Sequence, residues 1–198
     1  MSAFPQPIAP STVKIGSIQP TLVSTAQNLT RQVRSRGAHR WTISAKWDVL
    51  LRGEWSAMMG FAQSLRGQFN TCTFVLPGNL SNPVGVASGV PVVNGAGQTG
   101  RSVATSGWTP NTTGVLKAGD VVKFAANKVY MLTADAASDA GGNATLAIEP
   151  ALFVSPANGE TVVASGVSFT VALTADTLES NVIPGGFYDF GVSFVEVP

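Results

Sequence analysis

The stretch that most constrains the fold is residues 41–77, where two strand-like segments flank the one clear helix pattern of the chain. Both outer segments alternate apolar and polar residues, which predicts strands with one buried face. From about Gly53 the apolar period becomes helical, and Gly67 can end a helix in the left-handed conformation, so a helix is predicted at 53–66. The apolar positions are Trp41, Ile43, Ala45 and Trp47, then Trp55, Met58, Met59, Ala62 and Leu65, then Cys72, Phe74 and Leu76.

The final segment, residues 187–196, also alternates and gathers four large side chains on one face, which are Tyr188, Phe190, Val192 and Phe194. A strand face this rich in aromatic residues has to be buried, and we expect it to join the sheet and helix of residues 41–77. Both ends of the chain then form one β-sandwich core domain with a flanking helix, residues 1–83 and 179–198. Burial of Trp55 in this core predicts that Trp55→Ala costs about 3–5 kcal/mol.

The residues between these two parts are predicted to form an inserted small all-β domain, residues 84–178. Residues 78–114 are rich in Gly, Pro, Asn, Ser and Thr, which marks a boundary. Within 115–149 short apolar strands alternate with turns, and residues 161–173 continue the strand pattern. The predicted fold class is therefore mainly β, with a small barrel or sandwich as the insert.

Composition leaves two explanations for how the protein stays dispersed. Hydrophobic residues make up 44% of the chain and charged residues only 12%, about half the usual charged share. Either neutral polar residues cover the surface, or much of it is buried in an assembly. The net charge of +1 gives no reason to expect nucleic-acid binding. One basic cluster could form a positive strip, although a solvated loop or an edge strand that resists wrong pairing is favoured. Its members are Arg31, Arg34, Arg36, His39 and Arg40.

The single Cys72 excludes an internal disulfide and alternates with apolar residues, so we interpret it as a small core residue. No apolar run approaches the roughly 18 residues of a membrane-spanning helix, and no membrane insertion is expected. The N-terminus lacks the basic and apolar regions of a signal peptide, so synthesis in the cytosol is expected. Residues 1–11 contain three prolines and few anchoring side chains, which predicts an extended arm.

Gly95, Gly97 and Gly100 spell the pattern G-x-G-x-x-G. A dinucleotide site also needs a helix that opens at the last glycine, with its N-terminus toward the phosphates. The residues that follow have no helical period, so a turn-rich loop is predicted.

No catalytic, cofactor or metal site is predicted. His39 and Cys72 cannot be placed together as a nucleophilic pair, and they are too few for a Cys/His zinc site. Asp135, Asp139 and Asn143 lack the spacing of a known calcium loop and predict a polar turn. A carboxylate pair for sugar hydrolysis is unsupported, because the three candidates lie far apart in the sequence: Glu149, Glu160 and Glu179. Trp108 lies in the loop-rich part and is the one candidate platform for a ligand such as a sugar.

Several motifs together resemble a family of tail proteins from long-tailed bacteriophages. The resemblance extends over nearly all of the chain beyond residue 10. It is carried by Arg40-Trp41, Trp47, Leu65 to Gln68, Asn70, Phe74 to Pro77, Gly95 to Gly100, Gly107-Trp108, Leu116 to Asp120 and Phe187 to Glu196.

The resemblance implies a minor tail protein, most like the distal tail protein that caps the tail tube. In that family a β-sandwich with one helix forms a hexameric ring, and a second β domain projects outward. It implies a homo-oligomer in the virion that contacts tube, tape-measure and hub or fibre proteins, with no catalytic residues and no cofactor. The alternative is a carbohydrate-binding β module of a phage tail, with Trp108 as its stacking platform.

Overall fold

The structure, a computed structural model, describes residues 1–198 apart from the side chain of Asn79. It is mainly β with a single α-helix, which confirms the predicted fold class. The chain divides into two compact units, each of which is described by itself below. The core unit comprises residues 1–72 and 171–197, and the inserted unit comprises residues 73–170.

These divisions fall earlier in the sequence than the expected ones after residues 83 and 178. The second differs because strand β11 (Ser168–Leu173) pairs with the last strand, β13 (Phe187–Glu196), through its three C-terminal residues. That backbone pairing assigns residues 171–178 to the core unit. The apolar residues of β11 resemble those of any strand in the insert and carry no sign of the partner strand.

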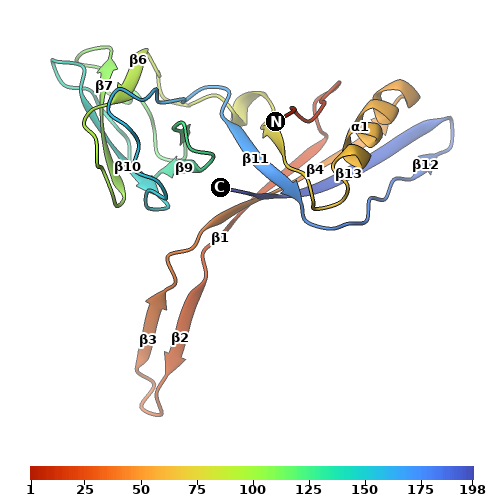
Figure 1. The fold of residues 1–198 in the computed structure, drawn as a ribbon, viewed down its shortest axis with the longest axis horizontal. Coiled ribbons are helices and arrows are strands. Elements are labelled where there is room, and N and C mark those ends of the chain that lie inside the picture. Colours follow the sequence, from red (N-terminus) through yellow and green to blue (C-terminus); the bar gives the residue numbers. More distant parts are fainter. The chain divides into compact units, whose positions relative to one another are not determined.

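The six-stranded sheet of the structure has the order β1-β4-β13-β11-β5, with the short β12 paired to β13 (Figure 1). β4 and β13 are direct neighbours although most of the chain lies between them, which confirms the expected place of the last strand. Helix α1 directly follows β4. The bounds are β1 Thr12–Ile18, β4 Arg40–Leu50, α1 Arg52–Ser64, β5 Cys72–Val75 and β12 Val182–Ile183.

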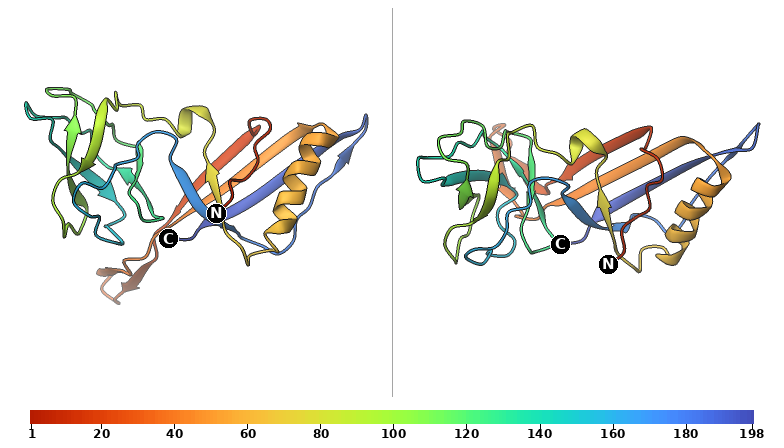
Figure 2. Two further views of the ribbon diagram at one scale, coloured as in Figure 1. Left: turned by 45° about the horizontal axis from the view of Figure 1, so that its top comes forward. Right: turned by 90° about the horizontal axis from the view of Figure 1, so that it is seen from above.

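The inner face of β4 and β13 is apolar, and the N-terminal arm and α1 pack against it. Phe4, which is 4% exposed, has its ring 5.6 Å from that of Phe61 on α1 and 5.4 Å from that of Phe194 on β13. The N-terminal arm (residues 1–11) is thus anchored by the aromatic side chain of Phe4, a contact that its proline-rich sequence did not predict. Figure 2 shows α1 alongside β4 and β13 in two further views.

The helix buries only part of its predicted apolar stripe. Met58 and Ala62 are fully buried, whereas Trp55 and Met59 are half-buried. The Trp55 indole stacks on Tyr188 with 4.8 Å between ring centroids, and its N–H donates to Ser180 Oγ at 2.7 Å. Because this indole keeps contact with solvent, we expect Trp55→Ala to cost less than the 3–5 kcal/mol of a fully buried tryptophan.

The inserted unit is built on a five-stranded antiparallel sheet of order β6-β7-β10-β9-β8. Its two edge strands, β6 and β8, both bridge to residues 161–163, through Val92 with Thr161 and Lys123 with Val163. The sheet therefore closes into a small barrel, which removes its free edges. The strands are β6 Gly89–Val93, β7 Ser102–Trp108, β8 Val121–Lys123, β9 Val129–Leu132 and β10 Ala144–Glu149, and a 3-10 turn at Gly78–Leu80 precedes them.

Candidate assembly surfaces

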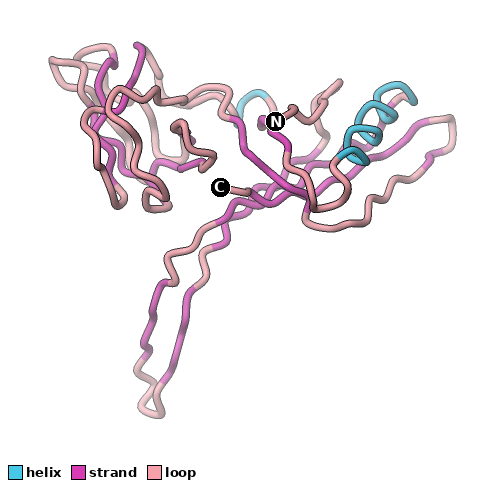
Figure 3. The backbone as a smooth tube through the Cα atoms, in the orientation of Figure 1, coloured by secondary structure: helices cyan, strands magenta, loops and turns pink.

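The first candidate surface is a hairpin formed by β2 (Thr21–Thr25) and β3 (Arg31–Ser35), which we call the hairpin arm (residues 21–35). All ten of its strand residues are exposed, and the ribbon extends away from the six-stranded sheet (Figure 3). A two-stranded hairpin is marginally stable by itself in water. The hairpin arm is therefore a candidate interface.

Apolar and basic side chains share the hairpin arm. Val23 and Val33 are opposite each other in the register and are 50% and 54% exposed, and Leu29 at the tip is 84% exposed. Arg31 and Arg34 on β3 make no ion pair with any described side chain. Part of the basic cluster thus lies on an exposed strand.

His39 lies at the base of the arm. Its Nε2 is 3.0 Å from Ser17 Oγ, and its ring packs edge-on against Trp41 with 4.7 Å between centroids. His39 thus contacts a serine and a tryptophan at the base of the hairpin arm, and the structure does not pair it with Cys72.

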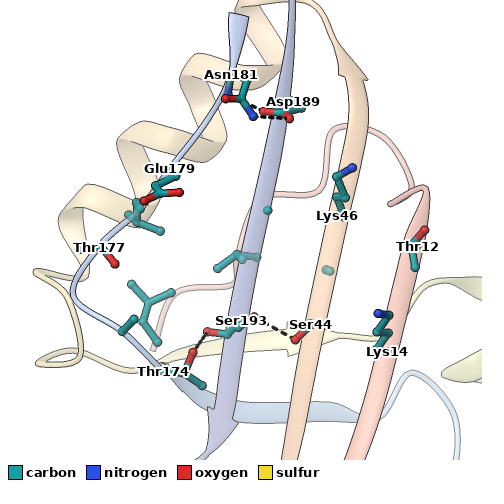
Figure 4. A pocket seen from close by; sticks show the side chains of 16 residues that line it. Thr12, Lys14, Ser44, Lys46, Thr174, Thr177, Glu179, Asn181, Asp189 and Ser193 are labelled. Carbon is teal, nitrogen blue, oxygen red and sulfur yellow. Dashed lines mark hydrogen bonds between the residues drawn. The ribbon is translucent and has the colours of Figure 1, made fainter.

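The second candidate surface is a groove of about 740 Å³ on the polar outer face of the six-stranded sheet (Figure 4). Its floor consists of small residues, because Gly191 and Ser193 alternate with the inward-facing aromatic residues of β13. Ser193 Oγ lies 2.9 Å from Ser44 Oγ on β4. The alternation of glycine and serine with Phe190 and Phe194 is the sequence signal that could have revealed this groove. The prediction for residues 187–196 used only the apolar residues of this alternation and left its small polar residues out.

One wall of this groove is the segment of residues 174–181, which we call the strap. It is held at both ends to β13: Thr174 N–H donates to Ser193 O at 3.0 Å, and the Asn181 side-chain amide donates to Asp189 Oδ2 at 2.9 Å. The side-chain amide and the backbone N–H of Asn181 both donate to the Asp189 carboxylate, and these hydrogen bonds lower the pKa of Asp189. The carboxylate is therefore ionised at neutral pH, and its stabilisation of the strap is lost only as the pH falls through that lowered pKa.

Charges along the groove are divided between its two sides. On the β1–β4 side, Lys46 forms an ion pair with Asp48 at 2.6 Å, and Lys14 lies nearby. The strap side carries Glu179 and Asp189 (Figure 4), and neither has a cation within ion-pair distance among the described side chains. The strap side is therefore the acidic side of the groove.

The glycine-rich loop of the inserted unit is a closed turn. Gly95, Gly97 and Gly100 have positive φ values of 100°, 75° and 83°, and strand β7 follows them rather than a helix. The Gln98 side chain closes the loop, since its Nε2 donates to Asn94 O, Gly95 O and Ala104 O and its Oε1 accepts from Ala104 N–H. The G-x-G-x-x-G pattern of residues 95–100 thus belongs to a turn-rich loop, as predicted.

Three of the carboxylates considered for chemistry are held by hydrogen bonds or an ion pair, and they are Glu149, Glu160 and Asp139. Glu149 pairs with Arg101 at 2.6 Å, and Glu160 accepts from Ala157 N–H at 2.9 Å. Asp139 caps a polar turn through Asn143, whose side-chain amide is the main cause of its lowered pKa. Among the described side chains, no three metal-ligating residues come together.

Trp108 lies inside the inserted barrel. Its side chain is only 3% exposed, and its ring N–H donates to Thr105 Oγ1 at 2.8 Å. The expectation of an exposed ligand platform is corrected here, because the indole is part of the core cluster and presents no open face. Its loop neighbours Gly107 and Pro110 suggested exposure, but Trp108 is the last residue of β7 and points inward.

Cys72 is fully buried, and burial raises the pKa of its thiol to about 11. A thiol that is both inaccessible and protonated reacts slowly, because the thiolate is the nucleophile. We expect the native protein to remain unlabelled by a thiol reagent under conditions that label the urea-unfolded protein completely. Mass spectrometry of the intact chain checks this result. Rapid labelling of the folded protein would contradict the core position of Cys72.

Within the described residues, no helix is long and apolar enough to span a membrane. Residues 80–167, inside the inserted unit, match the family model described as "Distal tail protein pb9, B domain". No curated protein matches the chain. The inserted unit is thus similar to a domain of bacteriophage distal tail proteins. Residues 80–167 belong to the B domain of the distal tail protein family, which confirms the resemblance found in the sequence.

Proposed function

We propose that the protein is a structural component of the phage tail tip, where copies of the core unit form a closed ring that continues the tail tube. The B-domain match supports a structural role in the tail and a place in the virion. In this proposal the ring attaches the distal components, and its partners are the tube, tape-measure and hub or fibre proteins. No enzymatic step is part of it.

The observation that carries the ring is the hairpin arm. Its strand residues are all exposed, although they include Leu22, Val23 and Val33. Burial against another subunit would remove this apolar surface from water and stabilise the ribbon. The low charged share of the chain agrees with such burial, because obligate interfaces resemble a protein core.

Light scattering of the purified chain over a range of concentrations tests the ring. We expect a single species several times the 20.4 kDa of one chain, with a hexamer as the first expectation, and ring-shaped particles in negative stain. The measurement is repeated with purified tail tubes present, because the tube end is the proposed template. A strict monomer that also fails to bind tube ends would overturn the proposal.

A carbohydrate-binding module is the alternative function. It rested on Trp108 as a stacking platform, and the buried position of that indole removes its main support. No other described feature favours it.

A further inference from the structure

The charges of the chain are separated along the sequence. Residues 1–47 contain no acidic residue. They contain six lysines and arginines, which are Lys14, Arg31, Arg34, Arg36, Arg40 and Lys46. Residues 129–198 contain acidic and no basic residues. As a result, the core unit carries a basic surface on the hairpin arm and an acidic surface on the strap side of the groove. Opposite charges on two surfaces of one chain are complementary between two copies of it.

The arm cannot reach the groove of its own chain. In the β1–β4 pair, Thr12 is opposite Lys46 at the groove end, and Ile18 is opposite Arg40 at the end where the arm departs. These ends are about 20 Å apart along the strands. Beyond the Ile18 end, the hairpin arm continues away from the six-stranded sheet (Figure 3). A contact between the two surfaces therefore requires a second copy.

We propose that the hairpin arm of one copy docks along the strap side of the groove of the next copy. The proposal rests on the proposed ring and specifies its subunit contact. Arg31, which shares its strand face with Val33, then faces Glu179 and Asp189, while the Val23–Val33 pair covers apolar side chains in and beside the strap. These are the half-buried Leu178 and the 71%-exposed Val182.

Such a contact is head-to-tail, because arm and groove are different surfaces at opposite ends of one strand pair. Head-to-tail contacts generate a ring when the rotation between copies closes. The basic side of the groove limits the arm to one wall: Lys46 is neutralised by Asp48, but Lys14 remains on the β1 side and repels the arginines. The charge pattern therefore also sets the direction in which the arm enters.

Reciprocal charge reversal tests the contact. Arg31→Glu/Arg34→Glu reverses the arm, and Thr177→Arg/Glu179→Arg reverses the strap without touching the Asn181–Asp189 hydrogen bonds. We expect either variant by itself to weaken self-association at least about tenfold in sedimentation equilibrium, and an equimolar mixture of both to restore it. The matched control, Arg52→Glu/Arg66→Glu, reverses two exposed arginines outside the arm and should associate like the unmodified chain.

A photo-crosslinker at Leu29 supplies a second measurement. We expect its crosslinks, mapped by mass spectrometry in a mixture of isotope-labelled and unlabelled chains, to join two different copies at residues 174–189. If the unmodified chain assembles and both reversals assemble equally well, or if the crosslinks map elsewhere, the docking is overturned while the ring stands. If the unmodified chain neither assembles nor crosslinks between copies, with or without purified tail tubes, the ring itself fails.

Discussion

We expect Trp47→Ala to lower the free energy of unfolding of the core unit by about 3–5 kcal/mol. Trp47 is fully buried, with its ring 6.2 Å from that of Phe4 and 6.0 Å from that of Phe190. Its N–H donates to Ile8 O at 3.0 Å, so the indole also ties the N-terminal arm to the sheet. Alanine would leave a cavity at the centre of the inner face and an unpaired carbonyl in the arm.

Hydrogen exchange followed by mass spectrometry is the suitable measurement, because peptides from the two units report their unfolding separately. Trp55→Ala is the matched control. It removes the same side chain from a half-buried place, and we expect a loss of about 1–2 kcal/mol. Equal losses for both variants would show that the inner face is not packed as described.

The second large effect is expected at Asp120 in the inserted unit. Its carboxylate is 5% exposed and accepts three backbone N–H groups, from Val84 at 2.7 Å, Gly85 at 3.0 Å and Lys117 at 2.7 Å. Asp120→Ala leaves these donors without an acceptor. We expect the inserted unit to lose about 3–4 kcal/mol, since each hydrogen bond to a charged group contributes about 1.5–3 kcal/mol and the three are not independent.

Urea unfolding, monitored by hydrogen exchange in peptides of the inserted unit, checks this loss of stability. Asp135→Ala is the control, because Asp135 is exposed and accepts one N–H, from Ala118 at 2.9 Å. We expect its effect to stay below about 1 kcal/mol. A near-neutral Asp120→Ala would mean that the segment around Val84 and Gly85 is held by other contacts.

Local pattern was sufficient for much of the fold. The period of two predicted β4 and β13, the helical period predicted α1 to within two residues at each end, and the bulk of the aromatic residues on β13 predicted its burial against β4. These inferences succeed because periodicity and side-chain volume are properties of consecutive residues. The absence of a helix after Gly100 likewise settled the glycine-rich loop.

Other features depend on residues far apart in the chain. Phe4 anchors the N-terminal arm only because Phe61 and Phe194 meet around it. Trp108 is buried only because apolar residues from many parts of the inserted unit gather in one core cluster. A local window around Trp108 shows glycine, threonine and proline, which are typical of exposed loops. Burial of a side chain at the end of a strand depends on which strand crosses it.

The sequence by itself therefore determined the fold class, the single helix, the role of the last strand and the relationship to phage tail proteins. Only the tertiary structure decided where the candidate assembly surfaces lie. The groove exists because β4 and β13 align Ser44 with Ser193 and because Asn181 and Asp189 hold the strap beside them. A surface of this kind arises from strand register and chain crossing, and neither is encoded in any single stretch of residues.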